Sequence, residues 1–177
     1  MDQGKAGTGG GRVITKVAEI VNWNDIILWG LLATGLLTTL MRGAEGLGYT
    51  RMDIPFMLGT MFTSNRDFAK VIGSVVHFIN GFLFSLLYAV FFSGFGFVSW
   101  WLGALMGIAH GAFVLIVVLP LLPGVHPRMA SEFWGPTPTR LLEPPGFLAL
   151  HYGYQTPTVT MIAHFAFGLV LGSFYNL

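Results

Sequence analysis

Three histidines lie in parts of the chain that carry no charged side chain. His77 and His110 fall between Lys70 and Arg128, a stretch without Asp, Glu, Lys or Arg, and His164 lies in the equally uncharged C-terminal end. An imidazole can ligate a metal or a tetrapyrrole, and it can relay a proton. In an apolar helix it can also hydrogen-bond to a neighbouring helix and hold the two together. The residues around each histidine bear on this choice.

The segments that follow two of these histidines resemble one another. HFINGFLFSLLY (77–88) and HFAFGLVLGSFY (164–175) share His, Phe, Gly and Tyr at the same offsets. Upstream, RMDIPFMLG (51–59) and RMASEFWG (128–135) begin with the same Arg-Met pair and carry a Phe at the same offset. We therefore predict an internal duplication, in which each half contributes two helices and the halves are related by an axis along the membrane normal.

Small residues recur at every fourth position around the histidines, so that they share one face of a helix. Such faces let two backbones approach closely, which is how helices associate in lipid, where the hydrophobic effect does not drive them together. We predict that the helix-packing faces contain Gly73, His77, Gly81, Ser85, Gly103, Gly107, Gly111, Thr160, His164, Gly168 and Gly172.

Two roles remain open for the histidines. In the structural role, which we favour, each imidazole donates a hydrogen bond to a hydroxyl or carbonyl group on a neighbouring helix. In the other, His77 and His164, with His110 as a further candidate, bind a haem or a chlorophyll-type pigment. The chain has no cysteine and its uncharged stretches contain no carboxylate. We therefore predict no metal-ion site, because zinc and di-iron sites use such ligands.

The elements that must position these residues follow from the composition. The chain is 54% hydrophobic and only 10% charged, whereas a soluble domain carries about a quarter charged residues. A membrane-spanning helix needs about 20 apolar residues. We predict an all-α integral membrane protein, with a Gly-rich tail and amphipathic segment at 1–24 and one domain over 25–177. Its four transmembrane helices are expected at about 26–44, 68–92, 98–121 and 157–175.

Two loops should lie on the same side of the membrane. In the first, Asp53 before Pro55 predicts the N-cap and first turn of a short helix that is too short to span and should lie in the interface. Asp53 could alternatively be an intramembrane proton or cation group. Ser64 is expected to cap the next helix. The Pro-rich loop at 126–156 cannot form regular helix, and we predict that it lies against another protein.

Basic residues predict the orientation. Of the nine Lys and Arg residues, three precede the first span, namely Lys5, Arg12 and Lys16. The other six flank or lie within the two loops, namely Arg42, Arg51, Arg66, Lys70, Arg128 and Arg140. Because cytoplasmic segments are enriched in such residues, we expect both loops to face the cytoplasm.

The run ATGLLTTLMRGAEGLGYTRMDIPFMLGTMF (33–62), followed by HFINGFLFSLLYA (77–89), resembles an uncharacterised family of small four-helix bacterial inner-membrane proteins. The loop is the most specific part of this resemblance, through the motif residues Met52, Asp53, Pro55 and Gly59. The resemblance implies the four-helix fold and a location in the bacterial inner membrane, and it implies no activity. The loop at 126–157 departs from the family because it is longer.

The sequence contains no Ser-His-Asp order, HExxH motif or P-loop, so we predict no enzymatic activity and no catalytic residue. A net charge of +1 gives no footprint for nucleic acid. We expect a non-catalytic accessory or structural subunit of a larger membrane complex, of respiratory or photosynthetic type, in contact with lipid and with other subunits. The alternatives are a small transporter or channel and a tetrapyrrole-binding membrane protein that uses His77 and His164.

Overall fold

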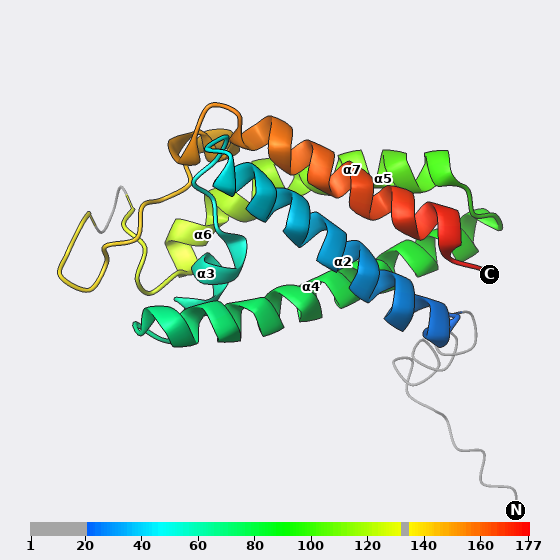
Figure 1. Ribbon diagram of the computed structural model, residues 1–177, viewed down its shortest axis with the longest axis horizontal. Helices are drawn as coiled ribbons and strands as arrows, with labels where there is room; N and C mark the ends of the chain where they lie inside the picture. Colours follow the sequence, from blue (N-terminus) through cyan, green and yellow to red (C-terminus); the bar gives the residue numbers. More distant parts are fainter. Residues whose placement is uncertain (1–20, 132–134) are drawn as a thin grey trace, which may run out of the picture.

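The computed structural model describes residues 21–131 and 135–177 (Figure 1). Over these ranges the chain forms helices and irregular connections, and no strand. Four helices are long and apolar enough to cross a membrane: α2 (Trp23–Gly46), α4 (Arg66–Phe95), a continuous helix over Trp100–Val125, and α7 (Thr156–Phe174). The predicted all-α architecture with four such helices is confirmed. Most of the predicted tail at 1–24 lies outside the described residues.

Three of the four long helices (α2, α4 and the one that begins at Trp100) begin at side-chain caps, whereas α7 has none. Asn22 accepts a hydrogen bond from the backbone of Asp25, and Asn65 accepts from Asp67 and Phe68. The cap of α4 is therefore Asn65, whereas the sequence pattern pointed to its neighbour Ser64. Such caps stabilise a helix by about 1 kcal/mol, because they satisfy backbone donors that have no partner within the helix.

The third long helix is not α-helical throughout. It consists of α5 (Trp100–Phe113), a π-helical turn (Val114–Val118) and α6 (Leu119–Val125). The predicted end near residue 121 is wrong, because the helix continues through Pro120 and Pro123. The π turn widens the helix directly before Pro120, and Leu119 N–H bonds to the carbonyl of Val114, five residues back. This widening makes room for a proline ring that would otherwise collide with the preceding turn.

Glycine lets the helix backbones touch. A Cβ atom at Gly103 would overlap the carbonyl oxygen of Gly168, so α5 and α7 meet backbone to backbone and run side by side (Figure 1). On the other side of the bundle, α2 crosses α4 where a Cβ at Gly81 would overlap the side chain of Thr34. Residues from all three predicted packing faces therefore lie at helix contacts. Whether the two halves arose by duplication stays a prediction.

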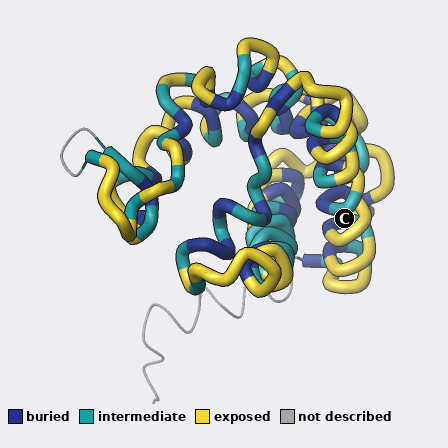
Figure 2. Tube along the Cα trace, turned by 60° about the vertical axis from the view of Figure 1, so that its left-hand side comes forward, coloured by how far each residue is buried: buried dark blue, intermediate teal, exposed yellow. Residues whose placement is uncertain are grey.

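The outward sides of the helices are apolar. On α4 the exposed Phe68, Val71, Val75, Ile79 and Leu83 recur every three or four residues, and Figure 2 shows exposed positions along the outer sides of the helices. An apolar outer stripe suits contact with lipid tails.

The short helix α3 (Ile54–Gly59) follows the first span. Its predicted cap is present, since the Asp53 side chain accepts a hydrogen bond from Phe56 N–H at 2.9 Å. Pro55, Met57 and Gly59 are buried, and a Cβ at Gly59 would overlap the backbone of Ala69 on α4. The interfacial position predicted for α3 relative to lipid stays a prediction.

The second loop contains one short 3-10 helix (Phe147–Tyr152) and otherwise irregular structure in its described part. Both loops lie at the same end of the bundle, at the left of Figure 1, opposite the C-terminus. They are joined there by Thr50, whose hydroxyl lies 2.8 Å from that of Thr156, and by Arg51 N–H, which donates to Tyr152 O at 2.7 Å. The Tyr152 carbonyl and the start of α7 thus hold the chain that leads into α3.

Candidate functional site

A cavity of about 130 Å³ lies inside the bundle, with walls from α2, α3, α4, α7 and the π-containing third span. Most of its lining side chains are Leu, Met, Val, Ile or Phe. The polar ones are Thr34, His77, Asn80, His110, Thr160 and His164. The cavity therefore collects the three histidines that the sequence singled out, each from a different helix.

His110 and His164 are in direct contact. Their ring centroids lie 4.7 Å apart and their planes are nearly perpendicular, at 84°. On its other side His110 stacks on Phe84 of α4, with centroids 3.8 Å apart. His77 lines the same cavity but makes no ring contact with either of the other two histidines. The pair expected from the sequence was His77 with His164, whereas the rings that touch are those of His110 and His164.

The tautomer of His164 follows from its hydrogen bond. Its Nδ1 lies 2.8 Å from the carbonyl oxygen of Thr160, and a carbonyl can only accept. Nδ1 therefore carries the hydrogen, and Nε2 of the neutral ring is left with a lone pair. His164 is 8% exposed. Its helix-internal bond differs from the bond to a neighbouring helix that the structural role predicted.

Polar atoms without a partner gather around this pair. Within the described residues, the buried side-chain atoms that lack a hydrogen bond are Tyr88 OH, His110 Nδ1 and Thr160 Oγ1. Thr160 is only 1% exposed and lines the cavity. By contrast, Thr34 of α2, which lines the same cavity, donates to the carbonyl of Gly30 at 2.7 Å. Leaving a buried polar group unpaired costs about 1–3 kcal/mol, so such atoms call for a bound water or ligand as their partner.

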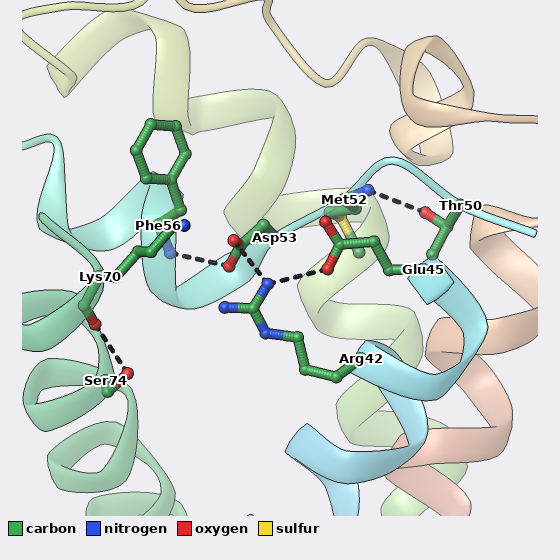
Figure 3. Close-up of polar contacts among 8 residues, drawn as sticks. All are labelled: Arg42, Glu45, Thr50, Met52, Asp53, Phe56, Lys70 and Ser74. Carbon is green, nitrogen blue, oxygen red and sulfur yellow. Dashed lines mark hydrogen bonds and ion pairs between the residues drawn. The ribbon is translucent and has the colours of Figure 1, made fainter. Parts of the chain in front are cut away.

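An ion pair stands near the cavity. Arg42 bonds to Asp53 at 2.7 Å and to Glu45 at 2.9 Å (Figure 3). A hollow of about 10 Å³ is lined by Arg42, Asp53 and His77 together, so the ion pair lies close to His77. Asp53 thus both caps α3 and neutralises Arg42, which accounts for an acidic residue at this position.

The remaining motif residues pack the loop against the bundle. Met52 is 1% exposed and lines the cavity. A Cβ at Gly73 on α4 would overlap the carbonyl of Pro55, so α3 lies directly on the backbone of α4. No pattern in the sequence predicts that this loop forms part of the cavity wall. Asn80, which also lines it, is the one further polar residue within HFING and could have been noticed for that reason.

His126 holds α3 to the end of the third span. Its Nε2 lies 3.0 Å from the Met57 carbonyl, so it donates there, and its Nδ1 accepts from Arg128 N–H at 3.1 Å. Burial lowers the pKa of His126, and the bond to Met57 partly offsets that effect. The side chain is fully paired and therefore structural. Within the described residues, no group of three His, Cys, Asp or Glu side chains could hold a metal ion.

We expect Thr160→Val to raise the free energy of unfolding of the ligand-free protein by about 1 kcal/mol, because it removes an unpaired buried hydroxyl at nearly constant shape. The matched control is Thr34→Val, which removes a hydroxyl that does have a partner and is expected to lower stability. Thermal unfolding in detergent measures both. Destabilisation by Thr160→Val equal to that by Thr34→Val would contradict an unpaired hydroxyl.

Acidification should weaken the α3 junction. The folded pKa of His126 lies below its unfolded value of about 6.5, so the unfolded state takes up the proton more readily and stability falls as the pH drops through that value. We expect the melting temperature to decrease from about pH 8 to about pH 5, and His126→Gln to reduce this decrease. An identical pH dependence in the variant would show that His126 is not responsible.

Comparison of the sequence with protein-family models, with curated proteins and with solved structures finds no significant match. The resemblance to small bacterial inner-membrane proteins therefore stays a prediction from the loop motif. The function has to be argued from the cavity itself.

Proposed function

We propose that the chain is a non-catalytic membrane protein that binds a small, mainly apolar molecule in the histidine-lined cavity. The observation that carries the proposal is the meeting of His77, His110 and His164, from three helices, at one cavity next to the unpaired hydroxyl of Thr160. Ionisable side chains at membrane depth are costly and usually mark functional sites. The π turn beside the cavity supports the same reading, since such turns are frequent at functional sites.

The walls define the chemistry of the ligand. Its body has to be apolar, because Leu, Met, Val and Phe side chains surround it. It should also carry a donor for the lone pair on His164 Nε2 and an acceptor that Thr160 or His110 can reach. We infer a neutral molecule with one or two polar atoms, because an unpaired ion would be too costly at this depth.

The volume argues for a small ligand. About 130 Å³ is close to the roughly 150 Å³ of an engineered apolar cavity that accepts benzene. It is well below the roughly 300–1,000 Å³ of pockets for drug-sized ligands. A haem or chlorophyll-type macrocycle would need the helices to move apart, so the cavity favours a smaller molecule over the tetrapyrrole alternative.

A bulkier side chain in the cavity wall tests whether the cavity binds a ligand. We expect His77→Phe to occupy ligand space, whereas Val75→Phe adds bulk to the lipid-facing side of the same helix. Mass spectrometry of small molecules extracted from protein purified from its native membrane should find a stoichiometric compound with the wild type and Val75→Phe, and lose it with His77→Phe. Absence of such a compound from all three, or its retention by His77→Phe, would contradict the proposal.

A second candidate function is the accessory subunit of a larger complex, in a bacterial inner membrane. It is favoured by the outer face of α2, where a Cβ at Gly35 or Gly43 would meet no atom within 4 Å. Thr39 lies between them and is exposed. The glycine faces of α5 and α7 are each covered by another helix of the chain. The small-residue face of α2 is not covered by any described part of the chain, and it could pack closely against a helix of a partner subunit.

Gly35→Leu tests this second candidate by removing the close approach. We expect a stoichiometric partner to co-purify in mild detergent with the wild type and to be lost from Gly35→Leu. Gly94→Leu is the control, because Gly94 on α4 likewise has nothing within 4 Å but lies outside the α2 face. Purification of the wild type without any partner would exclude the subunit role.

A further inference from the structure

A second and more polar hollow lies where α2 ends, α3 runs and α4 begins. It has a volume of about 300 Å³ and is separate from the histidine cavity, although Met57 touches both. Its apolar wall includes Phe56, Met57 and Leu142. The charged side chains that line it are Arg42, Glu45, Arg51, Asp53, Arg66 and Lys70.

The charges in this hollow do not cancel. Both carboxylates are bonded to Arg42, at 2.7 Å and 2.9 Å, as Figure 3 shows. Arg51 pairs outside the lining with Glu143 at 3.2 Å. Arg66 and Lys70 are then left, and within the described residues neither has a carboxylate at ion-pair distance. Because Arg51 and Glu143 neutralise each other, the lining keeps three cations (Arg42, Arg66 and Lys70) against two carboxylates, which is a net charge of +1. Arg66 and Lys70 are thus the two cations of the lining that have no ion pair among the described residues.

Arg66 and Lys70 are arranged around an apolar floor. The guanidinium of Arg66 lies 5.2 Å from the centre of the Phe56 ring, which fixes its position by a cation–π contact. Lys70 lies one turn further along α4, on the wall of the same hollow. Both are at the start of a membrane-length helix, where the headgroups of lipids lie.

We propose that this hollow binds an anionic phosphate group, presented by the headgroup of an acidic phospholipid. Arg and Lys side chains are the usual partners of phosphate, and basic pockets between transmembrane helices bind acidic headgroups. Phe56, Met57 and Leu142 accommodate the apolar part of the same molecule. The lipid then contacts α2, α3 and α4 together and stabilises their junction. This site does not depend on whether the histidine cavity binds a ligand.

Native mass spectrometry of the full chain, titrated with phosphatidylglycerol or with zwitterionic phosphatidylcholine, tests the proposal. We expect selective retention of phosphatidylglycerol. Loss of one charge contact in Lys70→Gln should weaken its binding about fivefold, and loss of two in Arg66→Gln/Lys70→Gln about thirtyfold. Both side chains are exposed, so the melting temperature of the delipidated variants, measured in detergent without added lipid, should stay near that of the delipidated wild type and show that the fold is intact.

Arg140→Gln is the matched control, because it removes a positive charge at the same end of the bundle from a residue outside the hollow. It should bind phosphatidylglycerol like the wild type. Equal retention of the two lipids, or equal weakening by Arg140→Gln and Lys70→Gln, would overturn the proposal.

Replacing chloride by inorganic phosphate at constant ionic strength distinguishes the two sources of the phosphate group. Phosphatidylglycerol that stays bound supports the lipid. Displacement by phosphate, combined with no selectivity between the two lipids, would identify the free anion as the ligand and overturn the lipid assignment.

Discussion

Backbone contact between α5 and α7 is the constraint on which the rest of the structure depends. Since lipid tails are as apolar as leucine, membrane helices are held together by close packing instead of by expulsion of water. Gly103 and Gly168 permit that packing, because any Cβ there would overlap the opposite backbone. The same closeness brings the ring centroids of His110 and His164 to 4.7 Å. The glycines thus set the position of the imidazoles as well as that of the helices.

The cavity exists because the start of α4 packs against α3. α3 lies on the backbone of α4 at Gly59 and Gly73, and His126 ties α3 to the end of the third span. The loop motif acts as a spacer between the start of α4 and the rest of the bundle, and the space is lined but not filled by its methionines. Unpaired polar atoms beside an incompletely filled space lower stability, and natural proteins accept such losses mainly where function requires them.

Much of this architecture could be predicted from the sequence, because charge-free runs of sufficient length have few solutions in lipid. The Asp53 cap could be predicted from the Asp-x-Pro pattern, because a helix cap depends only on residues that are neighbours in the sequence. The contact between His110 and His164 could not be predicted, because it depends on which helices pack through their glycine faces. The similarity between the two segments pointed to a pair of His77 with His164 instead. The continuation of the third span through Pro120 was missed because a proline normally ends a helix, unless a wider turn precedes it. The orphan hydroxyl of Thr160 depends on tertiary packing and has no signal in the sequence.

The π turn at Val114–Val118 has a consequence for how this chain can vary. Such a turn is equivalent to one residue inserted into an α-helix, and one residue corresponds to a rotation of about 100°. The residues before it, including His110, and those after it, including Leu119 and Leu122, all face the interior only because of that offset. A one-residue deletion here would leave an unbroken helix of good geometry and would still turn either the histidine or the leucines toward lipid. Relatives that lack this residue should therefore have a different interior on one side of the turn.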